Sequence, residues 1–428
     1  MLYRHRVLAL LFMLSIITYL DRVCISVAGA RMQSELGLSP SMWGWVVGAF
    51  TISYAAFEIP TGSWGDQYGP RRILTRIVLW WSAFTSLTGL ASNYHILLIT
   101  RFFFGAGEAG AYPNSASAIS RWFPTAERAR AAGTVWMASR IGGALSPVLV
   151  VPIQMAYGWR ASFYIFGTLG VFWCIVWYWW YRDHPSEKAG VTAKERETIG
   201  GSPTPEAHHG LPWSIALRSW NFWKILLMYH TYCWGGYFYL SWLHTYLQKG
   251  RGFTEVEMRS ISAWPFIAGT CGNFIGGMLS DYLCKRYGLR IGRRAVGATG
   301  LAMSGVFMMT TALTTDRMTA AWCLTLGYGS MDCMLPVAWA ICLDVGRKYA
   351  GAVTGSMNMA GQIGSFLSSV LFGYLVEWMG GDYNKPLIPL ATMLFVSAFI
   401  FTRIDPLEQI VDETKAPLPL AGAEPARA

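Results

Sequence analysis

The sequence Gly62-Ser-Trp-Gly-Asp66-Gln-Tyr-Gly69-Pro-Arg71-Arg72 separates two long apolar runs, and its pattern returns in the second half of the chain. The second copy reads Gly277-Met-Leu-Ser-Asp281, followed by Lys285-Arg286-Tyr-Gly288. The two aspartates are 215 residues apart, half of the 428-residue chain. This spacing indicates a duplicated unit, and duplication is typical of secondary transporters whose two halves move against each other.

Composition places this duplicated unit in a membrane. Hydrophobic residues make up 53% of the chain and charged residues only 14%, whereas a soluble protein of this length would carry far more surface charge. The apolar residues form runs close to the ~20 residues that span a bilayer. We therefore expect an all-α membrane protein with twelve transmembrane helices. The predicted spans are 7–30, 43–64, 73–91, 94–118, 131–156, 160–181, 221–247, 258–284, 295–314, 318–343, 350–375 and 387–403.

These spans divide the chain into four segments. We predict an N-terminal six-helix bundle over 1–181, a cytoplasmic linker over 182–220, a C-terminal six-helix bundle over 221–405, and a disordered tail over 406–428. The linker is polar, and the tail is rich in Ala, Pro and Glu, a composition that buries too little apolar surface to fold. The two bundles would be related by pseudo-symmetry.

Basic residues predict the orientation. Placing both termini in the cytoplasm puts 24 Lys and Arg side chains in inner segments and 7 in outer ones, as the positive-inside rule requires. We expect a multi-pass protein of a bacterial inner membrane that works as a monomer. The net charge of +10 could suggest nucleic acid, but the basic residues lie in short loops rather than in a compact basic domain, so no nucleic-acid partner is expected.

The sequence contains no motif that indicates an enzyme. The eight cysteines form no C-x-x-C pair, so neither a disulfide framework nor a zinc site is expected. There is no phosphate-binding glycine loop or nucleophile elbow, and we expect neither metal nor cofactor.

The repeated loop in a six-plus-six layout resembles the major facilitator superfamily over nearly the whole chain. Three strings resemble its anion:cation symporter family, which includes hexuronate, galactonate and phthalate permeases and sialin-like transporters: Tyr19-Leu-Asp21-Arg22, Arg101-Phe-Phe-Phe-Gly-Ala-Gly-Glu108 and Gly158-Trp159-Arg160. The resemblance implies a symporter that imports a small organic anion with protons by alternating access. A hexuronate, aldonate, aldarate or related carboxylate is the expected substrate. A proton-independent exchanger or facilitator of the same fold is the alternative.

The first and fourth predicted spans contain four charged residues: Asp21, Arg22, Arg101 and Glu108. Facing lipid, they would together cost roughly 10 kcal/mol or more, so they must face the bundle interior or an aqueous cavity. Arg101 and Glu108 are two turns apart, about 10 Å along one helix face, and each needs a partner on another helix. Residues of the first span are the obvious candidates.

The resemblance assigns roles to these charges. Arg22 would bind the substrate carboxylate, because a guanidinium matches a carboxylate with two parallel hydrogen bonds. Asp21 and Glu108 would carry protons, and Arg101 would orient a carboxylate. A structural ion-pair network is the alternative.

Further polar residues are candidates for binding substrate. Tyr19 and Tyr54 occupy positions where sugar-acid carriers of the family place hydroxyl donors, with aromatic packing as the alternative. Asn358 and Gln362, one turn apart, could reach the substrate from the second half or hydrogen-bond between helices.

Ser139 and Arg140 lie in the fifth span, where the relatives usually place small or amide residues. A second buried cation would suit a dianion. Alternatively, Arg140 pairs with an acid such as Asp332.

The repeated loops themselves would form a cytoplasmic latch that stabilises the outward-open state. In such a latch a carboxylate faces a helix N-terminus and arginines reach across the seam between the halves. Glu58, near the inner end of the second span, could join it. The predicted latch residues are Gly62, Asp66, Gly69, Arg71, Arg72, Asp281 and Arg286.

Overall fold

The computed structural model describes residues 2–188, 190–199 and 211–410, and this described part is helical without strands. The first bundle contains α1 (Tyr3–Glu35), α2 (Pro40–Tyr68), α3 (Pro70–Gly89), α4 (Tyr94–Glu108), α5 (Ala111–Trp122), α6 (Thr125–Tyr157) and α7 (Trp159–Trp180). The connecting segment contains η1 (Pro185–Glu187), α8 (Ala193–Ile199) and α9 (Trp213–Ala216). The second bundle contains α10 (Trp220–Ser241), α11 (Leu243–Thr245), η2 (Tyr246–Gly250), α12 (Glu255–Ile261), α13 (Trp264–Tyr287), α14 (Leu289–Leu313), α15 (Arg317–Asp332), α16 (Leu335–Gly346), η3 (Arg347–Tyr349), α17 (Ala350–Trp378) and α18 (Leu387–Arg403).

Every predicted span coincides with a helical rod. Four rods are interrupted: α4 is continued by α5, α10 by α11 and η2, α12 by α13, and α15 by α16. By length and composition alone, six helical segments of the described residues are long and apolar enough to cross a membrane, at 3–35, 130–157, 159–180, 289–313, 317–346 and 350–378. The remaining rods are shorter or carry more glycine and polar residues, which face other helices rather than lipid.

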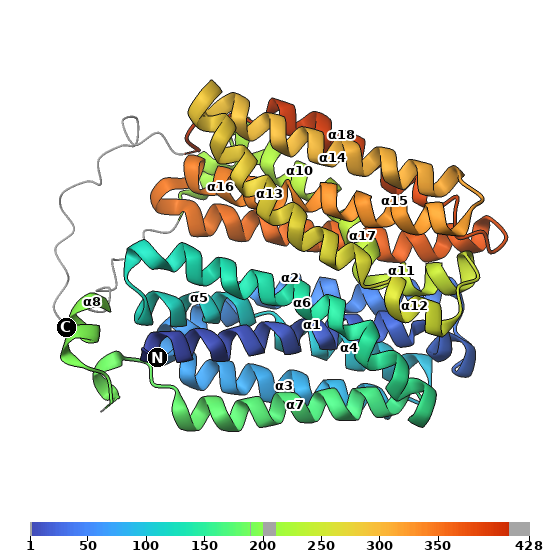
Figure 1. Cartoon of the computed structure of the whole chain (residues 1–428), viewed down its shortest axis with the longest axis horizontal. Helices are drawn as coiled ribbons and strands as arrows, with labels where there is room; N and C mark the ends of the chain where they lie inside the picture. The colour runs from blue at the N-terminus through green and yellow to red at the C-terminus, as the bar shows by residue number, and fades with distance from the viewer. Residues whose placement is uncertain (1, 189, 200–210, 411–428) are drawn as a thin grey trace.

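The rods form two bundles that lie side by side (Figure 1). In the first, α1 packs against α6 and α3 against α7; in the second, α14 packs against α18 and α13 against α15. The bundles meet mainly along α2 and α17. We call the end at which α1 begins and α8 lies the linker end, and the opposite end, with α11 and α12, the loop end (Figure 1).

Glycines bring α2 and α17 into main-chain contact near the loop end. A Cβ added to Gly44 would lie 2.7 Å from the Ser369 carbonyl oxygen, and one added to Gly373 would lie 2.3 Å from the Pro40 carbonyl oxygen. The two helices therefore touch without intervening side chains, as small residues allow at helix interfaces in membranes.

Ion pairs and hydrogen bonds also join the bundles at the loop end. The Arg31 guanidinium of α1 donates to both carboxylate oxygens of Glu255 in α12, at 2.7 and 2.8 Å. The Lys249 ammonium donates to the Gln33 amide oxygen at 3.0 Å. The loop end is thus closed in this conformation.

We expect Gly272→Ala to destabilise the second bundle. A Cβ on Gly272 would lie 2.0 Å from the Gly329 carbonyl oxygen, where α13 crosses α15, and overpacking of this kind costs about 1–3 kcal/mol. Thermal unfolding of the purified protein would show a lower midpoint. Gly277→Ala on the same helix is the control, because the nearest atoms lie 3.9 Å away. Equal midpoints for the two variants would contradict the tight crossing.

Candidate functional site

The centre of the first bundle holds an ion pair between Arg22 of α1 and Glu108 of α4. The Arg22 Nε donates to Oε1 of Glu108, and the two side chains are 9% and 0% exposed. In the described part of the chain, Arg22 Nη2 and Glu108 Oε2 are buried without a hydrogen-bond partner. Only one of the two parallel hydrogen bonds that such a pair can form is therefore made. The pairing agrees with the expectation that Glu108 finds a partner on the first span.

Aromatic rings surround the Arg22 guanidinium. Its central carbon lies 5.5, 5.1 and 4.8 Å from the ring centroids of Tyr19, Phe50 and Tyr54. Cation–π contacts of this kind stabilise a guanidinium that has left bulk water. The structure thus brings Tyr19 and Tyr54 to Arg22 through their ring faces, a role that the prediction of hydroxyl donors did not include.

Asp21 and Arg101 form the other side of this charged cluster. Asp21 is 1% exposed, and its carboxylate interacts electrostatically with Glu108 and Arg101. No hydrogen bond from the described residues reaches either of its carboxylate oxygens. The Arg101 guanidinium lies over the Phe104 ring at 4.3 Å. All four charges predicted to face the interior are buried there.

Arg140 makes the second buried ion pair, and this one joins the bundles. Its Nη2 donates to Oδ1 of Asp332 at 3.1 Å, and its Nη1 donates to the Tyr328 hydroxyl at 2.5 Å. The Nε atom lies 3.0 Å from Oδ2, with side-chain exposures of 9% and 0%. Of the two alternatives for Arg140, pairing with Asp332 is the arrangement observed. The neighbouring Ser139 hydroxyl donates to the Trp136 carbonyl within α6.

Asn358 of α17 binds an acid from the opposite bundle. Its amide donates to both carboxylate oxygens of Glu58 in α2, at 2.6 and 2.8 Å. Glu58 therefore lies in the seam between the bundles and interacts electrostatically with Arg22. Gln362, one turn beyond Asn358, is half-buried, and its Oε1 has no partner among the described residues.

Among the described side chains, the predicted latch does not cross the seam in this conformation. The Arg71 guanidinium donates to the Tyr178 carbonyl, at 3.0 and 2.8 Å, inside the first bundle. At the start of α3, the Asp183 carboxylate accepts a hydrogen bond from the Arg71 backbone N–H at 2.9 Å. The side chain of Asp66 lies outside the described residues. Gly69 joins α2 to α3 at a φ of 84°, a conformation that favours glycine.

The other latch residues also stay within their bundles. Asp281 lies 3.4 Å from Arg293, whereas Arg286 donates to the Tyr282 hydroxyl. A Cβ on Gly62 would lie 3.2 Å from Pro113, and Arg72 is exposed. In this conformation, with the loop end closed, Arg71 contacts its own bundle rather than the opposite one, and the latch predicted for the outward-open state stays a prediction.

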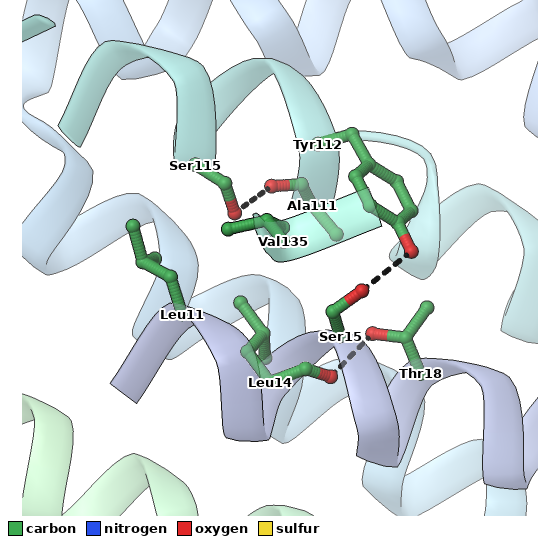
Figure 2. Close-up of a pocket in the computed structure, with 8 residues that line it drawn as sticks. All are labelled: Leu11, Leu14, Ser15, Thr18, Ala111, Tyr112, Ser115 and Val135. Atoms are coloured by element: carbon green, nitrogen blue, oxygen red, sulfur yellow. Dashed lines mark hydrogen bonds between the residues drawn. The ribbon is translucent and has the colours of Figure 1, made fainter. Parts of the chain in front are cut away.

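Sequence reasoning missed a crevice between α1, α5 and α6 and the aromatic column beside it. The Ser15 and Tyr112 hydroxyls are hydrogen-bonded at 3.1 Å, as Figure 2 shows. The Tyr112 ring is stacked on Trp136 at 4.5 Å, and Trp136 lies 5.5 Å from Trp339 of the second bundle. The crevice is too narrow to hold a water molecule and is lined by Leu11, Leu14, Ser15, Thr18, Ala111, Tyr112, Ser115 and Val135.

The signals for these residues were present but not decisive. Tyr112 follows Glu108 by one helical turn, yet aromatic residues are common throughout the spans, and only the fold shows which rings face the centre.

Comparison with known proteins identifies the family of the chain. Residues 11–369 match the sequence model of the Major Facilitator Superfamily. A probable sulfoacetate transporter of Cupriavidus necator is 36% identical over 94% of both chains. The hexuronate transporter of Bacillus subtilis is 28% identical over 94% of both. A probable galactarate/D-glucarate transporter of Escherichia coli is 27% identical over 90% of this chain and 89% of its own.

A solved structure shares the fold. A bacterial homologue of the human lysosomal transporter Spinster, in an inward-facing and unoccupied conformation, superposes with a TM-score of 0.77. It is 20% identical and covers 94% of this chain and 97% of its own.

Proposed function

The chain belongs to the Major Facilitator Superfamily, a family of multi-pass membrane transporters rather than enzymes, and from this premise we propose that it imports a small organic anion together with protons. A sugar acid or a related carboxylate or sulfonate is the proposed substrate, since the relatives are named for sulfoacetate, hexuronate and glucarate. The proposed location is a bacterial inner membrane, with both termini cytoplasmic and the protein working as a monomer.

The observation that carries the proposal is the ion pair of Arg22 and Glu108, in which only one of two possible hydrogen bonds is made. A buried guanidinium with an open donor can bind an anionic group that competes with the acid beside it. Isolated charges in the interior of a membrane protein are costly and usually functional. The ring of tyrosine and phenylalanine around Arg22 restricts its movement and holds it toward the centre.

Proton coupling follows from charge balance at this pair. When an anion replaces Glu108 on Arg22, an unpaired carboxylate would remain in a buried site, which is strongly unfavourable. A proton on Glu108 removes that charge. Binding of the anion and protonation of the acid therefore favour each other, and by reciprocity each raises the affinity for the other.

Alternating access would use the two bundles as moving parts. With the loop end closed and cytoplasmic termini, this conformation would face the cytoplasm. The outward-facing state requires the Arg31–Glu255 pair to break while the linker-end loops meet, where the predicted latch would then act.

Transport into proteoliposomes tests the proposal. With an acidic exterior, the purified protein should accumulate at least one of glucuronate, gluconate, glucarate and sulfoacetate above the outside concentration. Dissipating the pH gradient should abolish the accumulation. Uptake that needs a preloaded anion and ignores the gradient would instead indicate an exchanger, and no uptake of any of the four would refute the proposal.

A further inference from the structure

The two buried acid–arginine pairs lie at equivalent places in the two bundles. Glu108 is the last residue of α4 and Asp332 is the last residue of α15. In each rod two residues separate the acid from the next helix, and a proline stands in the first turn of that helix, Pro113 in α5 and Pro336 in α16. Proline removes a backbone donor and interrupts the helix. Both copies of the duplicated unit therefore have an acidic residue at the equivalent helix interruption.

Both acids occupy a place that disfavours negative charge. The C-terminal end of a helix carries a partial negative charge, and both carboxylates are 0% exposed. Each is paired with one arginine supplied by another helix, Arg22 for Glu108 and Arg140 for Asp332, and Glu108 also interacts electrostatically with Arg101. Removing the paired arginine would leave Asp332 as a buried carboxylate without a compensating cation, and would leave Glu108 with Arg101 only.

The two arginines lie in one region of the protein. The Tyr19 ring of α1 is 5.5 Å from the Arg22 guanidinium carbon. Gly142, two residues after Arg140 on α6, packs against α1 closely enough that an added Cβ would lie 3.1 Å from the Tyr19 Cβ. Tyr19 thus adjoins Arg22 and packs against the helix that carries Arg140.

Uncharged groups otherwise surround Asp332. Its Oδ2 would lie 2.7 Å from a Cβ added to Gly269 of α13. The titratable and charged groups that interact with it in the described part of the chain are Arg140 of α6, Tyr232 and Tyr239 of α10, Tyr328 of α15, and Cys333. Arg140 is the single cation in this set.

We propose that Arg140 and Asp332 form a second binding site, which accepts a second anionic group of the substrate while Asp332 takes up a proton. The substrate is then a dianion, carrying two carboxylates or a carboxylate and a sulfonate, with one group on Arg22 and the other on Arg140. This inference rests on the proposed function and specifies its substrate class.

The charges balance at each pair. Before binding, each pair holds one positive and one negative charge. After binding, the arginine is neutralised by a substrate group, and the acid is neutral because it has gained a proton. Two protons therefore accompany each dianion at these pairs. The exchange also breaks the ion pair that ties α6 to α15, so occupancy by substrate releases a contact between the bundles.

Binding to the purified protein tests the second site, with glucarate against gluconate and sulfoacetate against methanesulfonate as matched dianions and monoanions. The wild type should bind the dianion of a pair more tightly. The double variant Arg140→Gln with Asp332→Asn, which preserves overall charge, should bind that dianion roughly 10- to 100-fold more weakly and the monoanion unchanged. Arg317→Gln, at the other end of α15 and exposed, is the control and should change neither affinity.

Proton uptake gives an independent readout that does not depend on the double variant. Calorimetry in buffers of different ionisation enthalpy should show one proton fewer taken up per dianion by Asp332→Asn than by the wild type. An unchanged proton count, or a double variant that keeps its preference for dianions, would overturn the second site.

Two other outcomes separate this inference from the proposed function. If the wild type binds monoanions as tightly as dianions, the dianion site is wrong and the proposed function stands. If the protein binds neither pair, both are wrong.

Discussion

Replacing Arg22 with lysine is expected to weaken substrate binding by roughly 10- to 100-fold, although the positive charge is kept. The guanidinium presents planar donors that match a carboxylate, and in this structure Nε is used while Nη2 is open. A lysine ammonium lacks this geometry and would be drawn toward Glu108 as a point charge. Equilibrium binding of the best substrate to the purified variant measures the effect.

A matched substitution elsewhere in the chain tests whether the weaker binding is specific to Arg22 or follows from replacing any arginine with lysine. Arg290→Lys changes an exposed arginine of α14 that pairs with Asp405, far from the Arg22 cluster in sequence and in the other bundle. Its affinity should equal that of the wild type. Unaltered affinity in Arg22→Lys as well would remove Arg22 from the substrate site.

Glu108→Gln is expected to abolish the accumulation of a monoanion such as gluconate by a pH gradient, and to remove one of the two protons coupled to a dianion, while leaving exchange of internal for external substrate. Each coupled proton can support about tenfold accumulation per pH unit, and glutamine cannot take up the proton. Because glutamine resembles the protonated acid, Arg22 would remain available to the anion. Uptake under a gradient and counterflow, measured on the same proteoliposomes, report the two properties separately.

Glu197→Gln provides the comparison, since Glu197 is exposed on α8 and should leave both activities intact. Gradient-driven accumulation of gluconate by Glu108→Gln would show that a group other than Glu108 carries the proton. Loss of both activities would indicate that Glu108 acts mainly by holding Arg22 in place.

The sequence was sufficient to predict the helical rods and the presence of charged residues in the interior. Apolar runs of bilayer length form few structures other than transmembrane helices. The four charged residues of the first and fourth spans need partners away from lipid, so the burial of Asp21 and Glu108 could be predicted. The resemblance also predicted the superfamily, which the comparison with known proteins confirms.

Pairings between the bundles were harder to predict, because they depend on how the two halves meet. The contact of Glu58 with Asn358 joins residues 300 positions apart, and no local pattern distinguishes a seam residue from one in a loop. The same holds for Arg140, for which the sequence left two partners open. Arg71 contacts Tyr178 of its own bundle in this conformation, and a sequence does not specify which of two conformations is observed.

The glycine contact between α2 and α17 has a consequence for how the transporter is tuned. Main-chain atoms meet main-chain atoms there, so the contact has no flexible side chain that could lengthen or shorten by degrees. Packed interfaces of this kind are either engaged or separated. Partly open conformations at this end should accordingly be short-lived. The relative populations of the closed and open states should then depend on whether the buried charged residues have bound protons or substrate, and not on gradual changes in the contact between α2 and α17.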